Sequence, residues 1–435
     1  MTLFNKIRER RHDPESKTIL NNFFSLSLIQ GTNFILPLIV LPYLVNVIGI
    51  DKFGLVSFAQ ALMSYFIIFT DFGFNLTATR EIALYRHDHT KLSFIVNKTV
   101  LTKLFLCAFS FLILLGLVSF VPYFAAYAKM YYMAFLLVVA QVLIPAWFFQ
   151  GIEQMKYLTY INLIAKLIFT ALIFILITRP GDFIYVPLFY SLGNIISGII
   201  AFVIMYKQFG VRVHYPEDFN LKTELKKGWN VFLSNFAING YINSNLFILG
   251  LFTNNVVLGY YSIADKILYV FRQILNVFFN TTYPQACQKA TIGFTEVKKF
   301  YKKYFYGFCT MMIVLCGALF LLAEPITVFF AKETVPETIL AIRLLSFVPI
   351  IICLNIPAFQ ILLAYNFQRN YMLVLVGGSL LNVVLNLFLA PAFSMTGTAI
   401  SIIITEIFIT AGLYIALTLI HKKQTITNLT NSEAL

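Results

Sequence analysis

Charged residues are scarce in this sequence. They make up 12% of its 435 residues, whereas soluble globular domains carry roughly 25%, which cover a surface that faces water. Acidic residues are the rarer sign, with 19 Asp and Glu against 32 Lys and Arg. A chain with so few charges cannot cover a surface exposed to water, so the composition excludes an ordinary soluble domain.

Motifs for common catalytic chemistry are also missing. The sequence has no G-x-x-x-x-G-K-[ST] loop to hold the phosphates of a nucleotide. It has no Asp-rich motif that could bind Mg²⁺ for phosphoryl transfer. Its five cysteines lack the spacing of metal ligands and fall in or beside apolar runs, so we interpret them as small hydrophobic residues. We therefore predict no catalytic residue, no metal site and no cofactor, and a protein that is not an enzyme.

Apolar residues are abundant instead, at 59% of the chain. They gather in runs near the roughly 20 residues that an α-helix needs to cross a bilayer. The sequence therefore predicts an all-α integral membrane protein with twelve transmembrane helices. We expect them near residues 18–46, 53–79, 99–121, 127–149, 157–178, 183–206, 228–252, 256–284, 302–323, 338–363, 371–390 and 395–420.

The positive charges predict the orientation of these helices. By our count, 23 Lys and Arg fall on the side of the amino terminus and four on the opposite side. Loops rich in Lys and Arg stay in the cytoplasm, so we expect a multi-pass protein with both termini cytoplasmic. This asymmetry accounts for the net charge of +13 without a nucleic-acid partner. The predicted parts are a basic leader (1–17), a six-helix bundle (18–206), a cytoplasmic linker (207–227), a second six-helix bundle (228–420) and a cytoplasmic tail (421–435).

The two halves of the chain resemble each other. The segment GLVSFAQAL from Gly54 aligns with GYYSIADKI from Gly259, IPAW from Ile144 with IPAF from Ile356, and QMKY from Gln154 with QRNY from Gln368. Six helices per repeat give both copies the same orientation, so a pseudo-two-fold axis along the membrane normal would relate the two bundles. Rocking of one bundle against the other would give alternating access. One chain would then hold a complete pathway, and a monomer would be sufficient.

Ionisable residues within spans mark candidate sites, because each costs roughly 2.5–3.5 kcal/mol to insert. The predicted span 256–284 holds Asp265, Lys266 and Arg272. Arg272 suits an anionic head group because its planar guanidinium binds phosphate oxygens in pairs. An internal ion pair with a neighbouring helix is the alternative, and Lys266 points to a different wall.

Amide side chains form a second candidate site. Asn235, Asn239 and Asn243 step by four residues along the predicted span 228–252, and Gln30 occupies the position equivalent to Asn235 in the first repeat. Such a stripe either joins helices by hydrogen bonds or lines a hydrated cavity and binds sugar hydroxyls. We keep both interpretations.

One acid, Glu406, lies near the middle of the predicted span 395–420. Apolar surroundings favour the protonated form of a carboxyl group, so Glu406 could bind and release protons. Coupling to protons or sodium through Glu406 or Asp265 is one hypothesis, and a neutral, hydrogen-bonded Glu406 is the other.

Two segments carry a family resemblance. LPYLVNVIGIDKFGLVSFAQALMSYFIIFTDFGFNLTATREIA, from Leu41 to Ala83, and WFFQGIEQMKYLTYINLIAK, from Trp147 to Lys166, resemble the polysaccharide-export flippases of the Wzx type. The resemblance implies the fold of the multidrug/oligosaccharidyl-lipid/polysaccharide exporter superfamily, in the bacterial inner membrane. It also implies an undecaprenyl pyrophosphate substrate bearing an oligosaccharide, moved to the outer leaflet for O-antigen or a related surface polysaccharide, possible contact with the polymerase machinery, and a cationic cavity.

Four residues of these two segments, Asp71, Arg80, Gln150 and Glu153, would lie toward the cytoplasmic ends of their helices. They could form an inner gate by ion pairing, or they could only fix the loops. Three other functions remain open to the sequence: a cation-coupled multidrug exporter, a lipid II flippase and a membrane enzyme. More Lys and Arg than Asp and Glu in the predicted cavity disfavours the first, and short outer loops disfavour the last.

Overall fold

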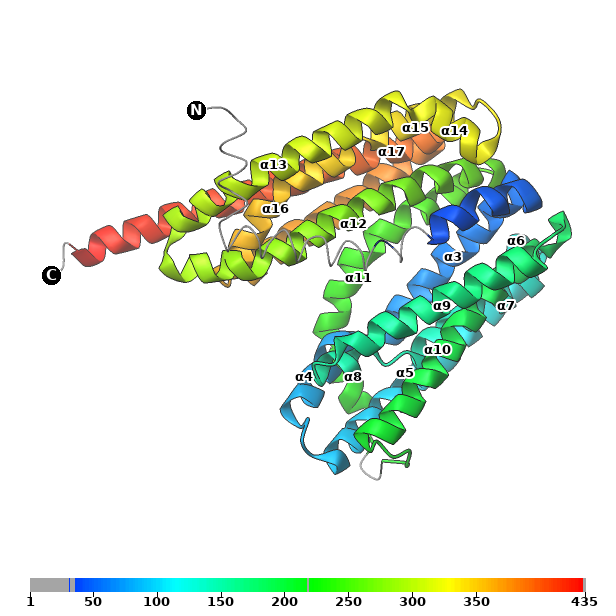
Figure 1. The fold of residues 1–435 in the computed structure, drawn as a ribbon, viewed down its shortest axis with the longest axis horizontal. Coiled ribbons are helices and arrows are strands. Elements are labelled where there is room, and N and C mark those ends of the chain that lie inside the picture. Colours follow the sequence, from blue (N-terminus) through cyan, green and yellow to red (C-terminus); the bar gives the residue numbers. More distant parts are fainter. Residues whose placement is uncertain (1–30, 32–35, 217–218, 433–435) are drawn as a thin grey trace, which may run out of the picture. The chain divides into compact units, whose positions relative to one another are not determined.

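The computed structural model describes residue 31 and residues 36–216 and 219–432; of residues 234, 237–242 and 420–432 it describes the backbone alone. Throughout these ranges the regular structure is helical, as the apolar runs predict (Figure 1). The contacts divide the chain into two compact units. The N unit ends at Ser262 and the C unit begins at Ile263, within the long helix α12.

The N unit starts with a helix over Leu36–Ile48. It continues with α3 (Ile50–Asp71), α4 (Phe74–Leu84), α5 (His89–Phe120), α6 (Pro122–Ala125), α7 (Ala128–Leu143), α8 (Ala146–Gly151), α9 (Met155–Leu176), the short 3-10 helix η1 (Pro180–Tyr185), α10 (Val186–Phe209), α11 (Leu221–Phe252) and the start of α12 (Asn255–Ile292). Helices α7, α9 and α10 pack side by side, and α11 packs on α3. The predicted linker contains the non-helical connection between α10 and α11.

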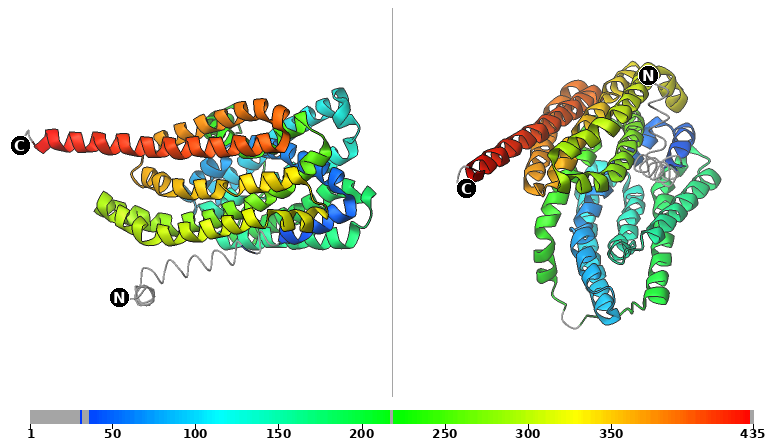
Figure 2. Two further views of the ribbon diagram at one scale, coloured as in Figure 1. Left: turned by 90° about the horizontal axis from the view of Figure 1, so that it is seen from above. Right: turned by 60° about the vertical axis from the view of Figure 1, so that its left-hand side comes forward.

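The C unit holds the rest of α12, α13 (Phe294–Leu321), α14 (Ala323–Ala331), α15 (Pro336–Leu345), α16 (Val348–Ala364) and α17 (Gln368–Ser432). Helix α17 contains a sharp break at Ser394, where φ is 54° and ψ is −134°. Figure 2 allows both parts of α17 to be followed, orange before this break and red after it. The break falls between the predicted spans 371–390 and 395–420, so α17 consists of two helices that meet at a kink at Ser394.

Eight helices within the described ranges are long and apolar enough to cross a membrane. One of them, Gln368–Leu419, contains both parts of α17 and has 52 residues, which at about 1.5 Å per residue is enough for two crossings. Helix α12 is not among the eight and is the span that carries Asp265, Lys266 and Arg272. The protein is therefore a multi-pass helical membrane protein, and the arrangement of twelve spans in two bundles remains a prediction.

Two aligned glycines of the internal repeat lie against each other in the N unit. A Cβ added to Gly54 in α3 would lie 1.9 Å from the Asn255 carbonyl oxygen, and one added to Gly259 in α12 would lie 2.2 Å from the Ile50 carbonyl oxygen. Residues 50 and 54 align with residues 255 and 259 at the same offset in the repeat, so the two contacts are reciprocal. A reciprocal contact of this kind is what a two-fold axis produces.

Candidate functional site

The carboxylate of Glu406 lies beside Arg272 in the C unit. Its Oε1 is 3.8 Å from Nη2 of Arg272, and the two side chains are 4% and 15% exposed. Arg272 comes from α12 and Glu406 from the second part of α17. The structure thus brings together two residues for which we predicted different roles: Arg272 for binding an anionic head group and Glu406 for coupling to an ion. Glu406 is not isolated, because a buried cation accompanies it.

Fully buried polar side chains lie around Glu406 on both parts of α17. Asn382, Asn386, Ser401 and Thr405 are each 0% exposed. Asn382 donates from Nδ2 to Thr405 Oγ1 at 3.2 Å, and the Thr405 hydroxyl donates to the Ser401 carbonyl oxygen at 2.7 Å. The sequence analysis did not select these residues. Their spacing by four, the same as in the stripe at Asn235, was the signal that could have identified them.

Asp265 and Lys266 stand on α12 before Arg272, and both are partly buried. Seven residues separate Asp265 from Arg272, which places them on one face of the continuous helix. Lys266 is the next residue along the helix after Asp265, so it lies about 100° around the helix axis from that face. These positions fit the predicted geometry of the span and leave the binding role of each residue as a prediction.

The amide stripe lies on α11, which is one continuous helix from Leu221 to Phe252. Asn235 and Asn243 are partly buried, and Ser244 and Asn245 beside them are buried. The helical register therefore places the predicted amides on one face. The Asn239 side chain and Gln30 lie outside the described residues.

The four gate candidates do not pair with one another in the described part of the chain. Asp71 accepts a hydrogen bond and a salt bridge from Lys103 at 2.7 Å, and Glu153 pairs with Arg86 at 3.3 Å. Arg80 and Gln150 are exposed. Asp71 and Glu153 thus each take a cation from α5 or from the α4–α5 turn, which the gate hypothesis did not include.

Lys103 lies within the predicted span 99–121 and has a partner inside the protein. A lysine in the inner half of a span commonly extends its ammonium group to the interface. In the structure its side chain is 1% exposed and its ammonium group is held by Asp71. A buried partner removes the need to reach water.

A network of four charges joins α4, α5 and α11, and the sequence analysis missed it. Lys98 Nζ lies 2.6 Å from Glu81 Oε2 and 3.4 Å from Glu224 Oε2, and Lys227 Nζ lies 2.8 Å from Glu224 Oε1. The Lys98 side chain is only 7% exposed. Lys98 was expected in a loop, but α5 begins at His89, where Asp88 caps the helix by accepting hydrogen bonds from the Thr90 and Lys91 amides.

Within the described residues no group of three His, Cys, Asp or Glu side chains could hold a metal ion. What the arrangement offers instead is cations and amides placed inside apolar helices. In a membrane such groups face the interior of a helix bundle or a hydrated path rather than lipid. Such groups within apolar helices are typical of membrane proteins with a polar interior.

Comparison with solved structures defines the class. The chain is similar to a multidrug resistance MATE family transporter of the MOP superfamily in its inward-facing conformation, with a TM-score of 0.65 and 13% identity over 90% of this chain and 99% of that one. It is also similar to an outward-facing MATE transporter, with a TM-score of 0.62 and 12% identity over 96% and 98% of the two chains. The protein therefore has the fold of MATE transporters.

Sequence comparison defines the family. Residues 19–288 match the model of the polysaccharide biosynthesis protein family, and the chain belongs to that family. A protein of Escherichia coli (strain K12) named "Putative O-antigen transporter" is 28% identical over 400 residues, which cover 91% of this chain and 95% of that protein. The resemblance seen in the segments from Leu41 and from Trp147 is confirmed.

Proposed function

We propose that the protein is a flippase that moves an oligosaccharide linked to undecaprenyl pyrophosphate from the cytoplasmic to the outer leaflet of the bacterial inner membrane. The coarser function, export of a lipid-linked polysaccharide precursor, is supported by the family and by the transporter fold. The product would be O-antigen or a related surface polysaccharide. The partners would be the lipid-linked substrate, membrane lipids and the polymerase machinery, and a monomer would be sufficient.

The pairing of Arg272 with Glu406 carries this proposal. A substrate with a pyrophosphate group needs a cation within the membrane-spanning helices, and Arg272, on the predicted span 256–284, is a guanidinium that is 15% exposed. Its planar group binds phosphate oxygens in pairs and is less strongly hydrated than an ammonium group. Glu406 neutralises Arg272 before the substrate binds, so that the cation does not stand alone in apolar surroundings.

If the pyrophosphate replaced Glu406 as the partner of Arg272, binding of the substrate would be coupled to binding of a proton. The pyrophosphate replaces Glu406 at the guanidinium, and Glu406 is left as a buried carboxyl without its cation. A carboxyl group in that situation takes up a proton. Export of the substrate returns Arg272 to Glu406, which releases the proton on the outer side, so that one proton would leave with each substrate. Alternating access would complete the cycle: movement of the two bundles against each other would open the site first to the cytoplasmic side and then to the outer side.

Sugar recognition would come from the amides. Asn235 and Asn243 on α11 are partly buried, and amide groups both donate and accept hydrogen bonds, as sugar hydroxyls require. Asn239 and Gln30 complete the predicted set. We assign selectivity among oligosaccharides to these residues rather than to the cations.

Deletion and complementation test the function. The gene would be deleted in its native host and replaced by wild type, Arg272→Ala or the control Arg343→Ala. Arg343 is another arginine of the C unit, and it stacks on the Phe320 ring at 5.5 Å. Surface polysaccharide and undecaprenyl-linked oligosaccharide in the inner leaflet would be measured, together with the abundance of each variant.

We expect the deletion to lose surface polymer and to accumulate lipid-linked oligosaccharide inside. Arg272→Ala should fail to restore the polymer when export is compared at equal abundance of the variants, whereas Arg343→Ala should restore it. Unchanged surface sugar with altered drug susceptibility would replace the proposal with a multidrug exporter. Accumulation of lipid II instead of the oligosaccharide would indicate a lipid II flippase.

A further inference from the structure

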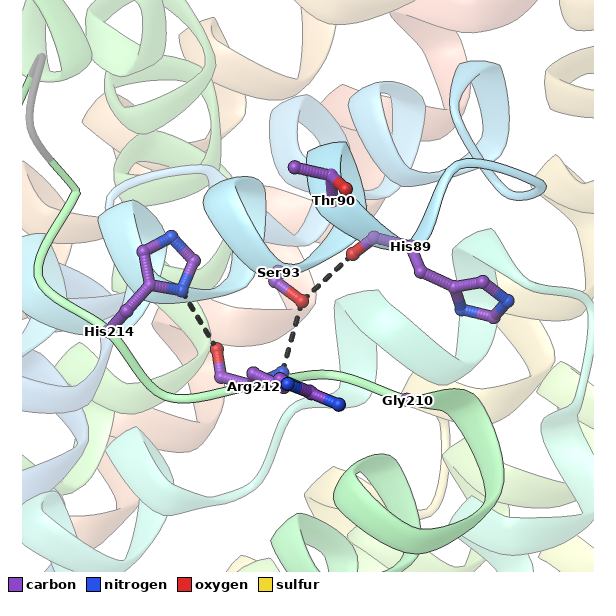
Figure 3. Close-up of a pocket in the computed structure, with 6 residues that line it drawn as sticks. All are labelled: His89, Thr90, Ser93, Gly210, Arg212 and His214. Atoms are coloured by element: carbon purple, nitrogen blue, oxygen red, sulfur yellow. Dashed lines mark hydrogen bonds between the residues drawn. The ribbon is translucent and has the colours of Figure 1, made fainter.

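A pocket of about 510 Å³ lies at the loop end of the N unit, where α10 ends and α5 begins. It is lined by His89, Thr90 and Ser93 of α5, by Gly210 after α10, and by Arg212 and His214 of the following connection. Figure 3 shows His89 and His214 at opposite ends, with Arg212 and Ser93 between them. None of these six side chains is acidic.

Hydrogen bonds fix the connection against α5. The Arg212 amide donates to Ser93 Oγ at 3.0 Å, and Asn97 donates from Nδ2 to the Arg212 carbonyl oxygen at 2.8 Å. The backbone of Arg212 is therefore held at two points while its guanidinium remains exposed. Although Arg212 lies in a loop, these two hydrogen bonds hold its backbone in a defined position beside α5.

Both imidazoles are oriented in the same way. Nδ1 of His89 lies 2.9 Å from the Phe209 carbonyl oxygen, and Nδ1 of His214 lies 3.1 Å from the Arg212 carbonyl oxygen. A carbonyl oxygen only accepts, so Nδ1 of His89 carries the proton in its contact with Phe209. Nδ1 of His214 also lies 3.2 Å from Nδ2 of Asn97, and in both rings the Nδ1 atom is engaged while Nε2 is left for a ligand. A ring that gains a second proton then donates from Nε2 and is positively charged.

Gly210 allows this arrangement. Its φ is +66°, and a Cβ at this position would lie 3.2 Å from Nδ1 of His89. A larger residue would strain the turn and crowd the His89 ring. Asp88, the nearest acid in sequence, caps α5: its hydrogen bonds from the Lys91 and Thr90 amides lower the pKa of its carboxyl group. Its charge is thus already engaged at the helix end.

We propose that this pocket binds a phosphate group, at a site additional to the one assigned to transport. The set of one guanidinium, two imidazoles and the Thr90 hydroxyl is a donor set for phosphate oxygens. The volume accommodates a phosphate with a small esterified alcohol such as glycerol. The two imidazoles are the only side chains of this pocket that commonly bind metals, and within the described residues no group of three His, Cys, Asp or Glu side chains could hold a metal ion.

The position of the pocket favours a phospholipid head group as the source of the phosphate. Helix α10 has 24 residues, or about 36 Å at 1.5 Å per residue, against a hydrocarbon core of about 30 Å. Gly210 follows its last residue, so the pocket falls at the level of the head groups. A soluble phosphate offers the same chemistry, and the experiment separates the two sources.

Binding would be measured on the full-length protein purified in detergent and in nanodiscs. One arm follows the unfolding temperature with inorganic phosphate against chloride at equal ionic strength. The other counts bound phosphatidylglycerol against phosphatidylcholine by native mass spectrometry. Both compare wild type with Arg212→Gln, His214→Gln and the control Arg86→Gln, which removes a nearby arginine whose ion pair is with Glu153.

We expect Arg212→Gln to weaken binding by roughly tenfold or more, His214→Gln to weaken it less, and Arg86→Gln to bind as wild type does. Loss of the phosphatidylglycerol signal alone identifies a head-group site, and loss of the phosphate-dependent stabilisation identifies a site for soluble phosphate. Equal binding by wild type and Arg212→Gln in both arms would overturn the proposal. Because Arg212 and His214 are exposed, neither substitution should prevent folding, and the outcome is independent of transport activity.

Discussion

At the residue scale, three buried cations each have a carboxylate partner on another helix. Lys98 meets Glu81 and Glu224, Lys103 meets Asp71, and Arg272 meets Glu406. The cost of inserting a charge predicts that such partners exist. It does not predict which residues they are, because the partners are remote in sequence: 32 residues separate Lys103 from Asp71 and 126 separate Lys98 from Glu224.

The Arg272 and Glu406 pair permits a double-mutant test. Arg272→Met alone should leave a buried carboxyl without its cation and lower the free energy of unfolding by about 3 kcal/mol. Glu406→Gln alone should also destabilise, because it removes the carboxylate beside the Arg272 guanidinium. The double variant should recover most of the stability, since two neutral side chains of similar length remain. Unfolding in detergent would be followed by helical circular dichroism.

Measuring export by the same three variants distinguishes a functional pair of Arg272 and Glu406 from a purely structural ion pair. We expect all three variants to lose export, including the stable double variant, because the guanidinium and the carboxyl group each act in the cycle. A double variant that exports normally would reduce Arg272 and Glu406 to a structural ion pair, and the phosphate site would have to be sought elsewhere.

At the element scale, the sequence predicted the apolar part of most helices but not their polar ends. Helix α5 starts at His89 instead of near residue 99, and α11 starts at Leu221 instead of near residue 228. Asp88 and Asn220 cap these helices by accepting backbone hydrogen bonds. Hydropathy marks where a helix leaves the bilayer, whereas the cap marks where it ends. The charge network of Lys98 and Glu224 was missed for this reason.

The short helix α14 was missed for a related reason. Its residues after Ala323 were expected in the outer loop, but Ala323–Ala331 form a separate helix before Lys332 adopts a left-handed conformation with φ of 57°. An apolar segment of nine residues is too short to cross a bilayer. Its helical state depends on local hydrogen bonding that a span-length search does not detect.

The crossing of α3 and α12 gives a prediction at this scale. Gly54→Ala and Gly259→Ala should each force the helices apart, because each new Cβ would lie about 2 Å from a carbonyl oxygen. We expect each to lower the unfolding temperature and the abundance in the membrane. Gly116→Ala in α5 and Gly317→Ala in α13 are matched controls with no neighbouring atom within 4 Å. They should be neutral or stabilising, since Ala favours a helix over Gly.

Gly54→Ala and Gly259→Ala should lower the unfolding temperature by similar amounts, because the contacts of the two glycines are reciprocal. Unfolding temperatures equal to that of wild type for both Gly54→Ala and Gly259→Ala would contradict the close crossing. An effect at only one of them would contradict the symmetry that the repeat implies.

At the scale of the whole molecule, the sequence predicted the class of the protein and the structure confirms it. Composition alone indicated a multi-pass helical membrane protein, and the two marker segments indicated the family. The buried polar contacts were less predictable, because Asn382 and Thr405 meet only when the break at Ser394 brings the two parts of α17 together. The sequence predicted the boundary between these two spans but not which of their side chains would meet across it.

The orientation of the chain in the membrane is the remaining prediction at this scale, and it rests on the excess of Lys and Arg on one side. Single cysteines would be introduced in a variant whose five native cysteines are replaced by alanine. Val213→Cys lies in the connection after α10, where Val213 is 84% exposed, and Thr334→Cys lies in the exposed turn before α15. A membrane-impermeant maleimide should label Thr334→Cys in intact spheroplasts and Val213→Cys only in inside-out vesicles. Because an odd number of spans would separate two such loops in the predicted topology, labelling of both from the same side would refute the twelve-span arrangement. The reversed pattern would keep the spans and place the basic loops, with the phosphate pocket, outside the cell.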